Sequence, residues 1–157
     1  TMAKHSGSTA ILTAVRHDID LHNVRTALRT LHSLPAERLP HLLPGGVIPP
    51  AELLGPREDI VHAVERSPLG FTLPAERLAT DDPRDLELSL SLITAADLAT
   101  LWNIPTSIEP LFAFASLALS QLKLLRSMLI AKRAGFTPQE VKRILPPFLP
   151  FTHYATA

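Results

Sequence analysis

Residues 9–32 read TAILTAVRHDIDLHNVRTALRTLH, and the pattern of this stretch decides the fold class. Leu21, Val24 and Leu28 recur at the three- and four-residue spacing of one face of an α-helix. Leu12 starts a second apolar stripe beside the first. Because two stripes on one helix require neighbours on more than one side, we predict an all-α fold, a helical bundle.

Fifteen prolines divide the rest of the chain into helices of unequal length. Proline lacks the backbone N–H that a helix interior needs, so a cluster of prolines marks the end of a helix. The predicted long helices run over 9–32, 83–102 and 109–134. The predicted short ones run over 36–43, from 50 or 56 to 66, and over 138–145. Residues 67–73 are expected to form a loop. The helix over 109–134 is apolar nearly all round, which predicts that it lies buried in the middle of the bundle.

We expect one helical domain over residues 11–147, preceded by a tag-like or disordered start, 1–10, and followed by a tail, 148–157. The domain contains an imperfect helix–turn–helix repeat, with units at about 11–66 and 83–147. The alignment pairs Leu21 with Leu122, Arg25 with Arg126 and Leu28 with Leu129.

Charge and composition argue against several classes of function. Lys plus Arg and Asp plus Glu each number 15, so the chain has no overall positive field to attract nucleic acid. The absence of cysteine removes disulfides, thiolate catalysis and cysteine-ligated zinc sites. The longest uncharged run in a predicted helix, 110–122, has 13 residues, whereas a membrane span needs about 20. We therefore expect no direct membrane span and no cofactor.

Two segments carry a resemblance to a known family. The stretch 18–29, DIDLHNVRTALR, is followed by LPAERL over 34–39 and by LLPGG over 42–46. This order is similar to a repeat unit of the central-stalk subunit of V/A-type rotary ATPases, called C in prokaryotes and d in eukaryotes. That unit reads acidic–aliphatic–acidic–x–x–Asn–x–Arg, then a short helix with Glu, then a Leu-Pro-Gly-Gly stop.

The C-terminal segment resembles the last unit of the same family. It begins with the acidic–Pro pair at Glu109, and it carries the family's Arg at Arg126 and its Lys at Lys132. Gln121 and Leu124 stand where the family has Glu and Asn. The resemblance covers residues 11–147, and the chain looks like the C-terminal half of such a subunit.

The resemblance implies a function without catalysis. Members of the family couple the ATPase shaft to the ion-translocating ring of the membrane, and they have no active site. The implied partners are therefore the shaft subunits and the rotor-ring subunits. The implied location is cytoplasmic, peripheral to a membrane as part of a complex that transports ions such as protons.

The candidate site residues are polar groups on the predicted helices. Asp18, Asp20, Asn23 and Arg25 are expected to form a polar cluster inside the bundle, because a buried arginine needs carboxylate partners. A structural lock between helices is the preferred interpretation, and a partner-binding patch is the alternative. Arg126 receives the same interpretation with less support, because Gln121 is neutral.

The basic residues of the C-terminal third admit two interpretations. Lys132 and Arg126 belong to this group. Their charges are either part of a solvated rim, in which the apolar stems cover neighbouring surface, or a contact with an acidic partner. The second interpretation places one partner contact near Arg126 and Lys132.

Two other functions remain open. A stand-alone helical adaptor for unrelated partners would have the same sequence pattern. The adjacent pair His17 and Asp18 is typical of metal-dependent phosphohydrolases, but no His-x-x-x-His pair accompanies it. Asp18 and His22, four residues apart, are better interpreted as a side-chain pair on one helix.

Overall fold

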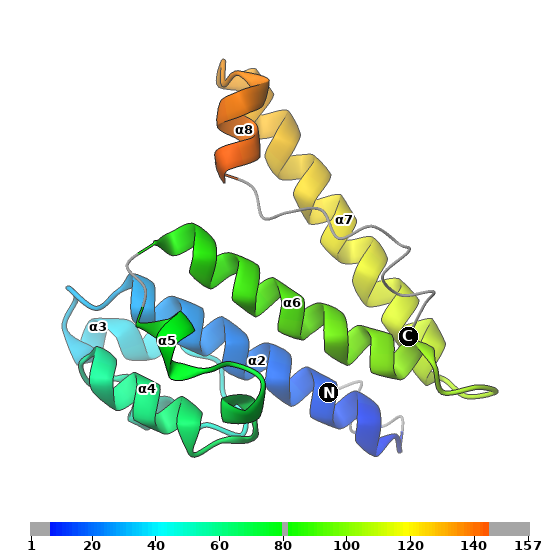
Figure 1. Cartoon of the computed structure of the whole chain (residues 1–157), viewed down its shortest axis with the longest axis horizontal. Helices are drawn as coiled ribbons and strands as arrows, with labels where there is room; N and C mark the ends of the chain where they lie inside the picture. The colour runs from blue at the N-terminus through cyan, green and yellow to red at the C-terminus, as the bar shows by residue number, and fades with distance from the viewer. Residues whose placement is uncertain (1–6, 80–81, 145–157) are drawn as a thin grey trace. The chain divides into compact units, whose positions relative to one another are not determined.

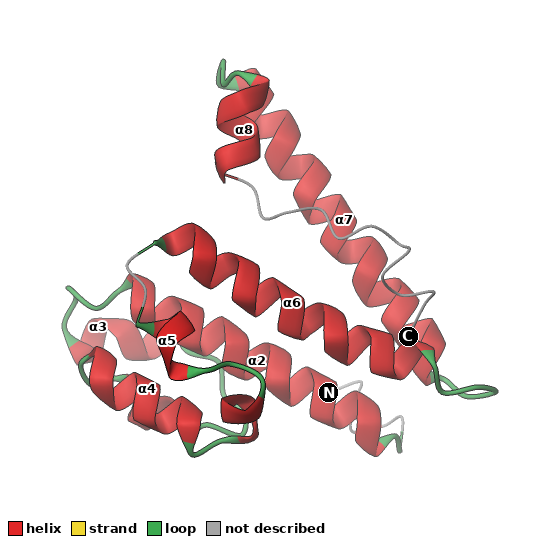
Figure 2. Cartoon of the chain, viewed as in Figure 1, coloured by secondary structure: helices red, strands yellow, loops and turns green. Residues whose placement is uncertain are grey.

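A computed structural model of the chain describes residues 7–79 and 82–144. Throughout these ranges the regular elements are helices, and no strand is present (Figure 2). The all-α prediction is therefore confirmed. The predicted tail, 148–157, and the first six residues of the predicted start lie outside the described ranges.

The three longest helices are α2 over Thr9–Arg29, α6 over Pro83–Trp102 and α7 over Glu109–Arg133 (Figure 1). Their bounds lie within a few residues of those predicted. Proline stands in the first turn of α6 and α7, where a missing N–H costs nothing. Gly135, with φ of 85°, follows the end of α7 in the left-handed conformation that commonly terminates a helix.

Among the described residues, six short elements lie between α2 and α6, and one more, α8, follows α7. They are α3 (Pro35–Arg38), η1 (Leu39–His41), η2 (Pro50–Leu53), α4 (Arg57–Glu65), η3 (Pro68–Phe71), α5 (Ala75–Leu78) and α8 (Pro138–Ile144). The helix predicted over 36–43 is split, because Pro40 has no N–H and the chain tightens into the 3₁₀-helix η1. The predicted loop over 67–73 contains η3, and α5 was not predicted.

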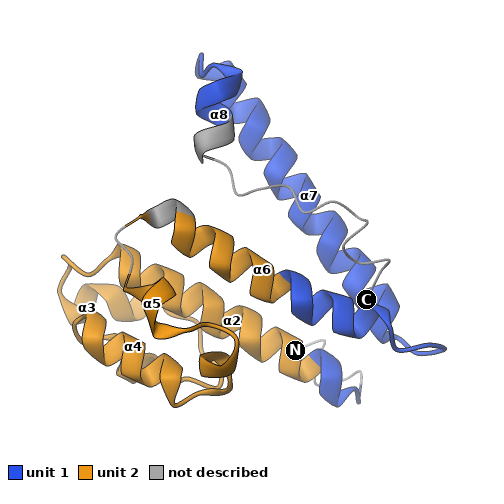
Figure 3. Cartoon of the chain, viewed as in Figure 1, with its two compact units in different colours: residues 1–11, 95–157 blue, residues 12–94 orange. Residues whose placement is uncertain are grey.

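The chain divides into two compact units (Figure 3). Unit 2 covers residues 12–94, and the described part of unit 1 covers residues 7–11 and 95–144. The division falls inside α2 and inside α6. The predicted internal repeat remains a prediction.

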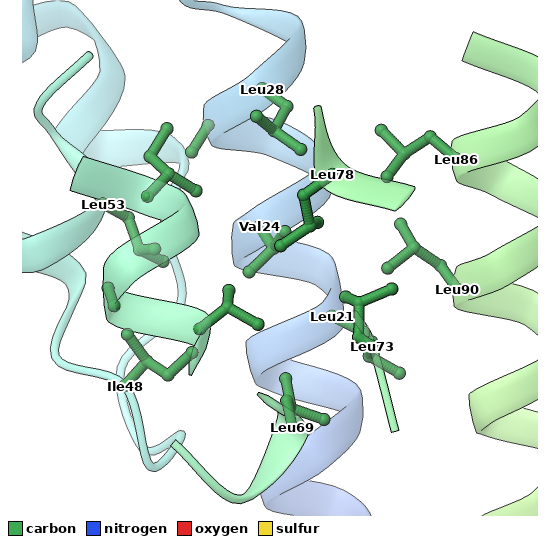
Figure 4. Packing of buried hydrophobic residues seen from close by; sticks show 14 of the residues in the cluster. Leu21, Val24, Leu28, Ile48, Leu53, Leu69, Leu73, Leu78, Leu86 and Leu90 are labelled. Carbon is green, nitrogen blue, oxygen red and sulfur yellow. The ribbon is translucent and has the colours of Figure 1, made fainter. Parts of the chain in front are cut away.

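The core of unit 2 is built around the predicted apolar stripe of α2. Leu21, Val24 and Leu28 are buried and point toward leucines of the short elements and of the adjoining part of α6 (Figure 4). Those leucines include Leu53, Leu69, Leu73, Leu78, Leu86 and Leu90. Each fully buried leucine contributes about 1.5–3 kcal/mol relative to an exposed one, so this cluster holds unit 2 together.

The prediction that the long apolar helix is buried is wrong. Within α7 only Ala113 and Leu117 are buried. Leu111, Leu122 and Leu129 are each more than 60% exposed. Besides α7, the described part of unit 1 contains residues 7–11, the last turns of α6, and α8, which are too few to surround a helix of 25 residues.

Among the described helices, α7 is long and apolar enough to cross a membrane by length and composition. One such helix is weak support for a membrane span, because helices with other roles meet the same criterion.

Candidate functional site

The first polar site of unit 2 is the carboxylate of Asp20, which is fully buried on α2. Its Oδ2 accepts a hydrogen bond from the N–H of Val47 at 2.9 Å, and its Oδ1 accepts one from the N–H of Ile48 at 3.0 Å. Burial raises the pKa of Asp20, and the two backbone hydrogen bonds partly offset that rise. The carboxylate therefore fixes the end of the turn that follows α3 and η1.

Asn23, one turn further along α2, is also fully buried and holds the start of the same turn. Its Nδ2 donates to the carbonyl oxygen of Leu43 at 2.8 Å, and its Oδ1 accepts from the N–H of Leu43 at 2.7 Å. One amide thus pairs with both backbone groups of one residue. We call Asp20, Asn23 and the backbone of residues 43–48 the α2 lock.

The glycines of the Leu-Pro-Gly-Gly stop are explained by the α2 lock. A Cβ added to Gly46 would lie 2.0 Å from Oδ1 of Asp20, far inside van der Waals contact. Gly45 has φ of 104°, a conformation that residues with a Cβ rarely adopt. The turn can therefore approach Asp20 only because these two positions have no side chain.

Arg25 does not join the lock. Its Nε donates to Oε1 of Glu87 on α6 at 3.0 Å, and Nη2 of Arg29 donates to the same oxygen at 2.7 Å. Asp18, which was expected in the same cluster, is exposed. The expected four-residue cluster is therefore corrected, because α2 turns Asp18 to solvent and Arg25 toward α6.

Sequence reasoning missed two further polar residues. Glu87 binds Arg25 and Arg29 of α2, although it lies about sixty positions away in the chain. Arg38 is 3% exposed, and its Nη2 donates to the carbonyl oxygens of Leu53 at 2.9 Å and Gly55 at 3.1 Å. Arg38 lies in the segment LPAERL, for which the resemblance specified a Glu and no arginine.

Glu109 marks the start of α7 in unit 1. Its carboxylate accepts a hydrogen bond from Oγ of Ser8, and hydrogen bonds from Ser107 and Ser8 lower its pKa. Oγ of Ser8 also accepts from the N–H of Ile11 at 3.1 Å. Glu109 therefore joins the first residues of α2 to the start of α7 within this unit.

Arg126 and Lys132 lie on the second half of α7 and are both exposed. Gln121 and Leu124, the two departures from the pattern that the C-terminal segment resembles, are half-buried on the same helix. Neither Gln121 nor Leu124 carries a carboxylate that could pair with Arg126. The two basic side chains are free to meet a partner from solution.

Two further features of the described residues bear on chemistry: the grouping of metal-ligating residue types and one hollow. These residues contain no group of three or more His, Asp or Glu residues that could hold a metal ion. A hollow of about 710 Å³ is lined by Ala51, Glu52, Gly55, Asp59, His62 and Arg66. Two of its side chains contact carboxylates, since Arg66 donates to Glu52 at 3.1 Å and Nδ1 of His62 lies 3.1 Å from Oε2 of Glu65.

We found no match to this chain among protein-family models, curated proteins or solved structures.

Proposed function

We propose that this chain is a non-catalytic central-stalk component of a rotary ATPase. In this role it couples the shaft to the membrane ion-translocating ring from the cytoplasmic side. The observation that supports the proposal is the α2 lock. Its side chains, Asp20 and Asn23, and its close-packed glycine, Gly46, all belong to the motif that carries the family resemblance.

The packing of unit 2 suits a part that transmits torque. A coupling element must be stiff, and close-packed interiors have low compressibility. The leucine cluster around α2 supplies such an interior, and the α2 lock adds hydrogen bonds at both ends of one turn. These features support the proposal that unit 2 is stiff enough to transmit torque.

The proposed partner contact lies on α7, near Arg126 and Lys132. Both side chains are exposed, so an acidic surface of a shaft or ring subunit can reach them without displacing the core. Because this contact pairs basic side chains with acidic ones, the affinity for the partner should fall as the salt concentration rises.

The test is the affinity of the chain for purified shaft subunits and for the purified ring, measured by biolayer interferometry. The double variant Arg126→Glu, Lys132→Glu should bind at least tenfold more weakly than the wild type. The matched control, Arg16→Glu with Arg77→Glu, reverses two exposed charges of unit 2 and should bind as the wild type does. Equal loss in both double variants would refute the α7 contact.

A stand-alone adaptor is the second candidate function, and the exposed apolar surface of α7 favours it. Such an adaptor would show no affinity for ATPase subunits. The phosphohydrolase hypothesis predicts a bound metal, detected by elemental analysis and lost in the variant His17→Ala.

A further inference from the structure

The exposed apolar residues of α7 form a single stripe. Leu111, Ala115, Ala118, Leu122, Leu125 and Leu129 follow one another at spacings of 4, 3, 4, 3 and 4 residues. All but the half-buried Ala118 are exposed, and Leu122 reaches 61% and Leu129 67%. Alternating spacings of three and four are the pattern by which one helix packs along another. We call these six residues the α7 stripe.

The α7 stripe is as apolar as the face of α2 that is buried in the core of unit 2. The predicted repeat pairs Leu122 with Leu21 and Leu129 with Leu28. Leu21 is 2% exposed and Leu28 is 9% exposed, because the short elements of unit 2 and α6 cover them. The corresponding face of α7 lacks such a cover among the described residues of unit 1, although its residues are equally apolar.

An antiparallel second copy of α7 fits the stripe layer by layer. In the register that centres on Ser120, the layers pair Leu111 with Leu129, Ala115 with Leu125 and Ala118 with Leu122 of the second copy, and each pairing occurs twice. Four of the six layers therefore set an alanine against a leucine, which allows the helices to approach closely. The contact would extend for about 27 Å along the helix.

Charge selects the antiparallel over the parallel arrangement. Lys132 continues the same stripe, three residues after Leu129. In the antiparallel register Lys132 lies beside Ile108 and Glu109 of the second copy, at the end of the contact. There its ammonium group can pair with the carboxylate of Glu109. In a parallel pair, Lys132 would face its own copy within the seam, and two like charges would be desolvated together.

We propose that a second copy of this chain covers the α7 stripe through an antiparallel α7–α7 contact. A lipid bilayer is the competing occupant of an exposed apolar helix. Lys123 and Arg126 lie in the second half of α7, so a bilayer would have to accommodate two charges within the span. The second copy leaves both of them at the edge of the contact.

The first experiment measures the mass of the full chain by light scattering during gel filtration at tens of micromolar. The wild type should have twice the monomer mass of 17.1 kDa, and Leu122→Lys should have the monomer mass. Leu34→Lys is the matched control, because Leu34 is 67% exposed, close to the 61% of Leu122, but lies in unit 2. This variant should remain dimeric. Circular dichroism checks that each variant retains its helices. A monomeric wild type, or a dimeric Leu122→Lys, would overturn the proposal.

The second experiment uses the absence of cysteine from the natural sequence. Chains carrying Leu111→Cys and chains carrying Leu129→Cys are mixed and oxidised. An antiparallel contact predicts a disulfide between the two different variants and little within either one, because like positions lie about 27 Å apart. Disulfides between like variants alone would show a parallel contact and contradict the proposal.

A third measurement tests the bilayer directly. The wild type and Leu122→Lys are sedimented with vesicles of phosphatidylcholine and phosphatidylglycerol. A wild type that is monomeric in solution but sediments with vesicles, while Leu122→Lys does not, would overturn the proposal in favour of a membrane. All three measurements use the chain alone, so their outcome is separate from that of binding to ATPase subunits.

Discussion

At the scale of single residues, the α2 lock depends on the two oxygens of Asp20, each of which accepts one backbone N–H. In Asp20→Asn an NH₂ group replaces one oxygen and faces a donor. One buried N–H is then left without an acceptor, and the free energy of unfolding should fall by about 1–3 kcal/mol. Asp18→Asn, at an exposed position of the same helix, should change it by less than about 0.5 kcal/mol. Urea unfolding followed by circular dichroism compares the two variants, and equal effects would show that the lock contributes nothing.

The raised pKa of Asp20 predicts the pH dependence of this same comparison. A carboxyl group whose folded pKa lies above its unfolded value, about 3.9, binds its proton more tightly when folded. The carboxyl group of Asp20 therefore adds to the free energy of unfolding in full at pH values below the unfolded pKa. This contribution is lost as pH rises through the folded pKa. The unfolding free energy of the wild type, measured relative to Asp20→Asn, should therefore decrease from pH 3 toward pH 7. A relative stability that increases over this range would contradict the assignment.

At the scale of elements, Glu87 joins α6 to two arginines of α2. The side chains of Arg25 and Glu87 are 29% and 20% exposed, so solvent screens this pair only in part. Glu87→Gln should lower the unfolding free energy by about 1 kcal/mol. In the exposed pair of Arg66 with Glu52, Glu52→Gln should cost less than about 0.5 kcal/mol. Thermal unfolding of both variants measures the difference, and a larger loss for Glu52→Gln would count against the α2–α6 contact.

The long helices could be predicted from sequence because their signals are local. Prolines, Gly135 and the spacing of apolar residues set the bounds of α2, α6 and α7 within a few positions. Glu87 could not be found as the partner of Arg25, because nothing near Arg25 in the sequence points to a residue on α6. Asp18 and Asp20 offered nearer carboxylates, and only the rotation of α2 shows that Asp18 faces solvent.

The exposure of α7 could not be predicted for a different reason. A helix that is apolar nearly all round has the same sequence whether its own chain or a partner covers it. Whether α7 is buried depends on how many other segments of the chain pack around it. The spacing of apolar residues along one helix does not give that number. Leu28 and Leu129 illustrate the point, since they align in the predicted repeat but are 9% and 67% exposed.

At the scale of the whole molecule, the proposed function assigns a different role to each of the two units. Unit 2 has a continuous leucine core and the α2 lock, which suit a rigid body. Unit 1 presents an exposed apolar helix with basic side chains beside it, which suits docking. The rigid core of unit 2 and the exposed helix of unit 1 are the two features behind the binding role that we propose.

The most direct test of that role is co-elution of the wild-type chain with separately purified shaft subunits and rotor ring of a V/A-type ATPase. The mixture is run on gel filtration at tens of micromolar. We predict a shift of the chain into a complex of fixed stoichiometry with the shaft, the ring or both. Elution of the chain at its own position in the presence of either partner would contradict a central-stalk function.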